Sequence, residues 1–137
     1  ASDVGFHNCL RKNSKVFFFD FEHAGLDDIA KLAIDFILQP DSINHPKYLE
    51  DMFEYFSKID GLNINWLKRF KQYLDIYRIK WVLIMFKRLK INFKKKSAGE
   101  IYAYFSKIKK YYDLSLPVVE ESKKICCEFY KTKKEGA

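Results

Sequence analysis

The apolar residues near the start of the chain follow the spacing of a short β-hairpin. Residues 9–12 and 16–20 form two segments of strand length, and residues 16–19 are all apolar. Asn13 and Ser14 lie between the segments, and both residue types are typical of turns. The pattern therefore predicts two strands joined at residues 13–14.

After this hairpin the apolar residues recur every three or four positions, which is the spacing of one face of an α-helix. A first helix is predicted between its capping residue, Asp27 or Asp28, and Pro40. A second is predicted over residues 46–58, because proline suits the first position of a helix. The apolar residues that set this spacing are Ile29, Leu32, Ala33, Phe36 and Ile37, followed by Tyr48, Met52, Phe53 and Phe56.

Four further helices are predicted in the second half of the chain. Residues 65–77 and the segment from there to about residue 93 each carry an apolar face, and the two segments can form one continuous helix. Residues 94–97 are expected to form a loop and a helix cap. A fifth helix follows to about Tyr112, and residues 117–131 form the sixth. The predicted fold class is mainly α, with a short hairpin followed by about six helices.

The composition supports a single helical domain with its own core. The chain has 137 residues, of which 48% are hydrophobic and 18% aromatic, but it has only five glycines and three prolines. This low turn content favours helices over a β-rich fold. The three cysteines are Cys9 and the adjacent pair Cys126 and Cys127, which form no disulfide framework and fit a reducing cytoplasm. No targeting segment and no apolar run of membrane-spanning length is apparent, so no membrane association is expected.

Charge is divided unevenly along the chain. Residues 1–65 carry six Lys/Arg and eleven Asp/Glu, whereas residues 66–137 carry nineteen and seven. A solvated helical surface accounts for the basic half without any function. No nucleic-acid recognition motif accompanies the lysines, so nucleic acid is not expected as a partner. The oligomeric state is left open by the sequence.

Two acidic clusters flank the predicted hairpin. Asp3 and Asn8 belong to the first, and Asp20 and Glu22 to the second. A hairpin between the clusters would bring two carboxylates and a carboxamide together, and oxygen ligands of this kind suit Mg²⁺. The spacing also matches the kinase template D-x-x-x-x-N followed by D-F-G, in which these groups serve phosphoryl transfer.

The same residues resemble a known family. Ser2-Asp3-x-Gly5-Phe6-His7-Asn8, the apolar strand into Asp20-Phe21-Glu22, and Ala24-Gly25-x-Asp27-Asp28-x-Ala30-Lys31-Leu32 are similar to the aminoglycoside phosphotransferase and choline kinase group, which has a protein-kinase-like fold. The resemblance covers about residues 2–40. It continues more weakly in Arg78-x-Lys80-Trp81.

This resemblance implies a role for each acidic residue. Asp3 would be the catalytic base, Asn8 and Asp20 would be Mg²⁺ ligands, and Glu22 would occupy the third place of the metal motif. The implied activity is Mg²⁺-dependent transfer of the ATP γ-phosphate to a hydroxyl group of a small molecule. Apart from the resemblance, the basic helices after residue 65 favour a neutral or anionic acceptor. An acidic stretch leaves a cationic acceptor open as the alternative, and its residues are Glu50, Asp51, Glu54 and Asp60.

The resemblance also implies a domain organisation. Residues 1–26 would form the catalytic loop and metal-binding hairpin, and residues 27–137 the helical subdomain of a C-terminal kinase-like lobe. Nothing in the chain resembles the small nucleotide-binding lobe, its strand lysine or a glycine-rich phosphate loop. The chain is therefore expected to be inactive alone.

Several alternatives remain open at this point. Asp35, near the apolar face of the first helix, is either a buried, paired carboxylate that supports the catalytic loop or a solvated residue at the edge of that face. Cys126 and Cys127 are expected to pack between helices. The chain as a whole could also be a basic helical binding module without chemistry, or a kinase-like scaffold without turnover.

Overall fold

The computed structural model describes residues 8–19, 27–40, 43, 46–59, 62–92 and 96–135, except for the side chains of residues 91 and 92. Within these ranges the chain forms one β-hairpin followed by four helices. The strands are β1 (Cys9–Lys12) and β2 (Lys15–Phe18), and the helices are α1 (Ile29–Leu38), α2 (Tyr48–Ser57), α3 (Trp66–Asn92) and α4 (Ala98–Glu135).

The predicted hairpin is confirmed, including its turn. β1 and β2 are antiparallel, and the pairing runs from Cys9 opposite Phe18 to Lys12 opposite Lys15. Asn13 and Ser14 have φ angles of 48° and 62°. Positive φ at both central residues gives a two-residue turn whose twist matches that of the strands, and asparagine tolerates this conformation well.

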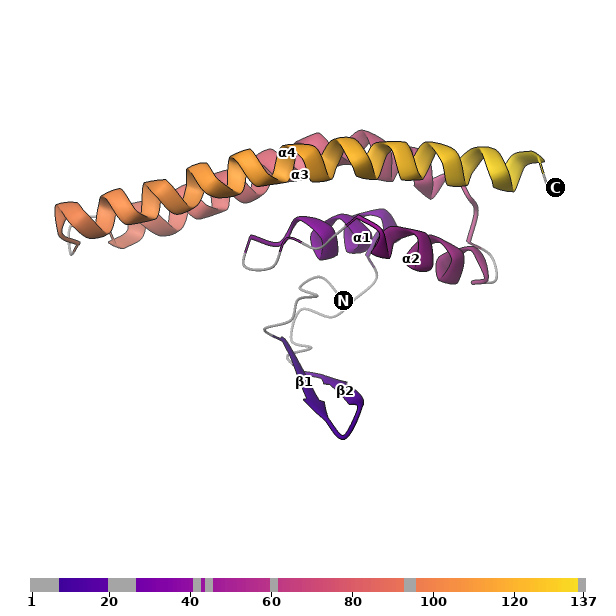
Figure 1. Ribbon diagram of the computed structural model, residues 1–137, viewed down its shortest axis with the longest axis horizontal. Helices are drawn as coiled ribbons and strands as arrows, with labels where there is room; N and C mark the ends of the chain where they lie inside the picture. Colours follow the sequence, from indigo (N-terminus) through magenta and orange to yellow (C-terminus); the bar gives the residue numbers. More distant parts are fainter. Residues whose placement is uncertain are drawn as a thin grey trace.

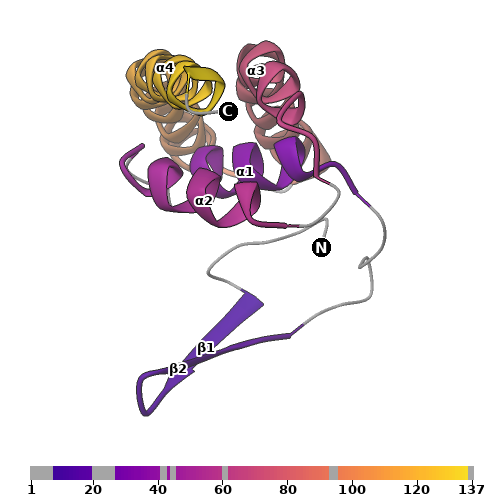
Figure 2. The same ribbon diagram turned by 90° about the vertical axis from the view of Figure 1, so that its right-hand side faces the viewer.

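The helices form two layers. α3 and α4 lie side by side as a long antiparallel pair, and α1 and α2 pack together across one side of it (Figures 1 and 2). The hairpin stands apart from both layers, on the side of α1 and α2 (Figure 1). α3 and α4 extend well past α1 and α2 at the end where residues 92–98 join them.

The main core lies where the two layers meet, and aromatic rings fill its centre. Phe53 of α2 is fully buried and makes edge-to-face contacts with Trp66, Phe70 and Phe129, at centroid distances of 5.3, 5.1 and 5.5 Å. A smaller cluster around Met85 and Ile108 joins α3 to α4 near the far end. Ring packing thus makes up the centre of the main core.

The expectation of about six helices is wrong, because the structure has four in its described part. The third and fourth predicted helices are one continuous helix, α3, as the sequence allowed. The fifth and sixth also merge, and α4 continues through Pro117, where a break was predicted.

Packing against α3 explains why Pro117 does not end α4. A proline inside a helix lacks the N–H that the carbonyl four residues earlier would accept. One turn before Pro117, the carbonyl oxygen of Tyr112 accepts hydrogen bonds from Arg78 Nη2 at 2.8 Å and from Ser115 Oγ at 3.2 Å. Side chains on both sides of the proline, Ser115 and Val119, are fully buried. The tertiary contacts therefore hold the helix together across the weak turn.

The helix N-termini follow the sequence more closely. Asp28 caps α1, since its Oδ1 accepts a hydrogen bond from the backbone N–H of Ala30 at 3.0 Å. Ser97 and Glu100 form a reciprocal capping box before α4, in which Ser97 Oγ accepts from the N–H of Glu100 and the carboxylate accepts from the N–H of Ser97. None of the helices in the described ranges is long and apolar enough to span a membrane.

Candidate functional site

Asn8, one of the two predicted metal ligands, lies at the open end of the hairpin. Its backbone oxygen accepts a hydrogen bond from the backbone N–H of Phe19 at 3.0 Å, which extends the β1–β2 ladder by one pair. Asn8 is only 7% exposed, whereas the side chains of β2 are all exposed. The hairpin is therefore buried at Asn8, where its two strands begin and end, and its turn at residues 13–14 faces solvent.

The other members of the predicted site lie outside the described residues. Asp3 belongs to range 1–7, and Asp20 and Glu22 belong to range 20–26. The structure does place the two described residues next to these ranges, Asn8 after the first range and Phe19 before the second. The hydrogen bond between Asn8 and Phe19 holds these two residues side by side.

Asp35 is buried and paired and is not a solvated residue at the edge of the helix face, whereas its support of the catalytic loop stays a prediction. It is 6% exposed on α1. Its Oδ1 accepts a hydrogen bond from Lys80 Nζ of α3 at 3.0 Å, and its Oδ2 lies 3.5 Å from Lys31 Nζ. A buried carboxylate needs such partners, since an unpaired charge in the interior is costly.

Lys31 connects this pair to the start of the helix. Its Nζ donates to Asp27 Oδ2 at 2.6 Å, so a chain of alternating charges runs from Asp27 through Lys31 and Asp35 to Lys80. Asp27 is the first described residue after range 20–26. The charge chain therefore ties the end of that segment to both α1 and α3.

Asp28 makes a second connection between the same elements. Besides capping α1, its carboxylate accepts two hydrogen bonds from Arg69 of α3, from Nε at 2.8 Å and from Nη2 at 3.1 Å. Bidentate pairing of this kind fixes direction as well as distance. Asp27 and Asp28 thus anchor the entry to α1 by two independent ion pairs.

These contacts set the charge state of the anchor. The hydrogen bond from Arg69 holds the pKa of Asp28 below its usual value, and the hydrogen bond from Lys31 does the same for the pKa of Asp27. Both carboxylates are therefore ionised at neutral pH, and each is paired with a basic side chain of the chain itself, Lys31 or Arg69. In the described ranges no group of three or more His, Cys, Asp or Glu side chains could hold a metal ion. The predicted metal ligand Asp20 and its neighbour Glu22 lie in range 20–26, outside these ranges.

We predict that the Asp28–Arg69 pair stabilises the fold at neutral pH and not at low pH. The folded-state pKa of Asp28 is lowered, so its contribution is present above the unfolded-state pKa and disappears as the pH falls below about 4. Asp28→Asn keeps a capping side chain but removes the charge. It should lower the free energy of unfolding by about 0.5–1 kcal/mol at pH 7, because the pair is partly exposed.

Urea unfolding at pH 7 and pH 3 measures this difference. The gap between wild type and Asp28→Asn should close at pH 3, whereas Asp28→Ala should remain destabilised at both pH values by loss of the cap, about 1 kcal/mol. Asp113→Asn, in the exposed pair with Lys109, is the control and should change stability by less than about 0.5 kcal/mol. An equal gap between wild type and Asp28→Asn at both pH values would contradict the assignment.

The sequence did not reveal Arg69 and Lys80 as partners of the acidic residues. Lys80 stands out in the sequence only as part of Arg78-x-Lys80-Trp81, and nothing distinguishes Arg69 from the other basic residues of α3. Both pairs join residues more than 40 positions apart. Such pairs depend on how α3 crosses α1, which helical spacing in one segment does not specify.

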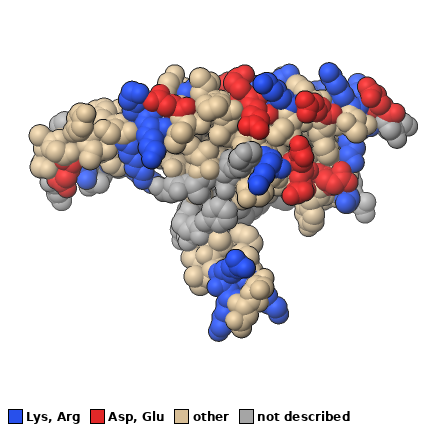
Figure 3. Space-filling model, in the orientation of Figure 1, with Lys and Arg blue, Asp and Glu red and all other residues tan. Residues whose placement is uncertain are grey.

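The outer surface of the hairpin combines basic and apolar side chains. Arg11, Lys12 and Lys15 gather near the turn, where Figure 3 shows Lys and Arg next to uncharged surface. Phe17, Phe18 and Leu10 are each more than half exposed. A two-stranded hairpin with uncovered apolar faces is marginal on its own, so its stability depends on the ladder and the covered end around Asn8.

Comparisons of the chain with known protein families, with curated proteins and with solved structures found no match.

Proposed function

We propose that the chain is the C-terminal lobe of a Mg²⁺-dependent phosphotransferase that moves the ATP γ-phosphate to a hydroxyl group of a small molecule. The observation that carries the proposal is the hydrogen bond between Phe19 N–H and Asn8 O at 3.0 Å. It joins the last residue of the D-x-x-x-x-N segment to the residue that directly precedes the D-F-E segment. Phosphoryl transfer needs a base and metal ligands gathered around one point, and this hairpin supplies such a meeting place.

Each acidic residue has one chemical task in this proposal. The Asp3 carboxylate accepts the proton of the acceptor hydroxyl as its oxygen forms a bond to the γ-phosphorus, and the bond from that phosphorus to the bridging oxygen of ADP breaks. Asn8 and Asp20 supply oxygen ligands, and Glu22 stands beside them in the third place of the motif. Mg²⁺ bound there would neutralise charge on the phosphates.

The ion pairs of Asp27 and Asp28 at the start of α1 favour a fixed position for the end of the segment that carries Asp20 and Glu22. Asp27 and Asp28 follow the segment that carries Asp20 and Glu22, and their pairs with Lys31 and Arg69 hold its end against the helices. The buried Asp35–Lys80 pair continues the same support into the core. Positioning of this kind matters because catalytic groups lose effect when displaced by about 1 Å.

The test is a phosphotransferase assay on the complete protein that contains this chain. Mg²⁺-dependent conversion of ATP to ADP would be measured with a panel of hydroxyl acceptors for wild type, Asp3→Asn and Asp20→Asn. Loss of the general base should lower kcat by about 10²–10⁴-fold. Asp20→Asn should also raise the Mg²⁺ concentration needed for half-maximal activity, because a charged ligand is replaced by a neutral one.

Asp51→Asn is the matched control, since Asp51 is an exposed carboxylate on α2 away from the hairpin. It should leave kcat and the Mg²⁺ requirement unchanged. Full activity of folded Asp3→Asn and Asp20→Asn would refute the proposed roles. If wild type neither binds nucleotide nor transfers phosphate while lysine substitutions in α3 and α4 abolish binding of an acidic partner, the chain is the basic binding module instead.

A further inference from the structure

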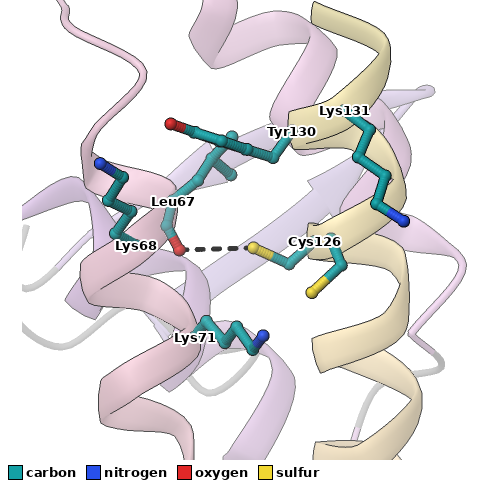
Figure 4. A pocket seen from close by; sticks show the side chains of 7 residues that line it. Leu67, Lys68, Lys71, Cys126, Tyr130 and Lys131 are labelled. Atoms are coloured by element: carbon teal, nitrogen blue, oxygen red, sulfur yellow. Dashed lines mark hydrogen bonds between the residues drawn. The ribbon is translucent and has the colours of Figure 1, made fainter. Parts of the chain in front are cut away.

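A small cavity opens between the first turns of α3 and the last turns of α4. Its volume is about 230 Å³. Leu67 and Cys126 form its floor and are almost fully buried, and the ring of Tyr130 lies along one wall (Figure 4). The Cys126 thiol donates a hydrogen bond to the Leu67 carbonyl oxygen at 3.3 Å. The polar groups of the floor, the Cys126 thiol and the Leu67 carbonyl oxygen, are therefore already hydrogen-bonded to each other.

The floor is also electrically neutral. Burial raises the pKa of the Cys126 thiol to about 12, so this group carries no charge at physiological pH. Leu67 and the tyrosine ring offer only apolar surface. A ligand part that enters the cavity must be apolar, because it finds few unused hydrogen-bonding groups there.

The rim has the opposite character. Lys68 and Lys71 of α3 and Lys131 of α4 line the opening, on both sides of the cavity (Figure 4). None of the three forms an ion pair with a carboxylate among residues 8–19, 27–40, 43, 46–59, 62–92 and 96–135, although other lysines of α3 and α4 do. Lys68 lies over the Tyr130 ring, 5.9 Å from its centroid. Three lysines without a carboxylate partner in the described ranges thus give the opening a basic rim.

This cavity is separate from the proposed phosphoryl-transfer site. Arg69 points to Asp28 at the start of α1. An α-helix turns by about 100° per residue, so Lys68 and Lys71 project well away from the direction of Arg69. The cavity thus lies on a different side of α3 from the contacts that anchor α1 and the segment before it.

We propose that this cavity binds a small amphiphilic anion, with a short apolar chain on the Leu67–Cys126–Tyr130 floor and one carboxylate or phosphate head held by Lys68, Lys71 and Lys131. The volume lies below the usual range of drug-sized pockets, about 300–1,000 Å³, so the ligand is smaller than a nucleotide. Lysine holds anions as a point charge and does not select between planar and tetrahedral heads. The cavity would add a second binding function to the chain, independent of phosphoryl transfer.

The experiment compares octanoate, octyl phosphate, octanol and acetate as probes of the complete chain. Amide chemical-shift changes in NMR spectra would report binding at residues 67–71 and 126–131. The rate of alkylation of Cys127, which lines the same cavity, would report occupancy by peptide mass analysis. Octanoate and octyl phosphate should both bind at least about threefold more tightly than octanol, the effect of one partly exposed ion pair, and acetate should bind more weakly still. The tighter of the two anions identifies the head group.

Substitutions at the rim and the floor test the two halves of the proposal separately. Lys71→Ala and Lys131→Ala should each weaken octanoate binding by about threefold, and Cys127→Phe should abolish it by filling the cavity. Lys124→Ala is the control, because this exposed lysine of α4 does not line the cavity. Thermal unfolding would confirm that each variant is folded.

Three results would overturn the proposal. The first is that octanol binds as tightly as octanoate, which would exclude a role for the lysines. The second is that the lysine substitutions and the control have equal effects, which would indicate general electrostatic attraction. The third is that neither anion changes the amide chemical shifts of residues 67–71 and 126–131 at millimolar concentration, which would exclude the site. The chemical shifts and the alkylation rate do not depend on ATP turnover, so they test this cavity even if the phosphotransferase proposal fails.

Discussion

Phe53→Ala should lower the free energy of unfolding by about 3–5 kcal/mol, the largest effect that we expect for a single substitution in this chain. Phe53 is fully buried and its ring touches Trp66, Phe70 and Phe129 edge to face. Trp66 and Phe70 belong to the first turns of α3 and Phe129 to the last turns of α4, which lie at the same end of the antiparallel pair (Figure 1). Removing the ring therefore leaves a cavity at the point where α2 holds both long helices.

Chemical denaturation of wild type and variant measures this loss. Tyr55→Ala is the matched control, because Tyr55 is an aromatic residue of the same helix that is 69% exposed. Its substitution should cost less than about 1 kcal/mol. Similar losses for the two variants would mean that α2 does not pack on the long helices as described.

Arg78→Ala should cost about 2–4 kcal/mol through a different mechanism, the loss of polar contacts inside the α3–α4 interface. The Arg78 side chain is buried, and its guanidinium donates to Ser115 Oγ at 3.0 Å and to the Tyr112 carbonyl oxygen at 2.8 Å. It also stacks on the Tyr112 ring at 4.0 Å. Its removal leaves Ser115 Oγ without this donor and leaves the Tyr112 carbonyl oxygen with Ser115 Oγ as its remaining side-chain donor, close to Pro117, where α4 lacks a backbone hydrogen bond.

Arg78→Lys separates charge from geometry at this position. An ammonium group cannot donate two hydrogen bonds in a planar fork and stack at the same time, so Arg78→Lys should recover less than half of the loss. Arg88→Ala, at an exposed position of the same helix, is the control and should stay within about 0.5 kcal/mol of wild type. Hydrogen exchange should show faster opening of α4 around residues 112–119 in Arg78→Ala alone. Unchanged exchange there would contradict the assigned role of Arg78 in holding α4 together.

Local chemistry made much of the fold predictable. Asn13 and Ser14 favour a turn between the two strand segments, and asparagine tolerates the positive φ that this turn requires, so the strands pair in one register. Asp28 and Ser97 mark helix starts because their side chains accept hydrogen bonds from free backbone N–H groups. The location of Asn8 beside Phe19 also follows from this register, since one more pair extends the ladder.

Long-range packing decided the features that the sequence misplaced or left open. The sequence predicts two helices separated between Tyr112 and Pro117. Whether the chain stays helical there depends on tertiary contacts, and Arg78, which donates to Tyr112 and Ser115, lies 34 and 37 positions before them. Asp35 was ambiguous for the same reason, because its burial requires Lys80 on another helix. Contacts of this kind appear only when two helices cross at a particular place and angle.

The sequence by itself therefore determined the hairpin, its turn, the helix caps and the mainly helical class, because each rests on residues within a few positions of one another. Only the tertiary structure decided the number of helices, the pairing of Asp28 and Asp35, and the lysine-rimmed cavity above Cys126. Each of these depends on side chains from different helices, whose free energy of interaction exists only once the helices are packed together.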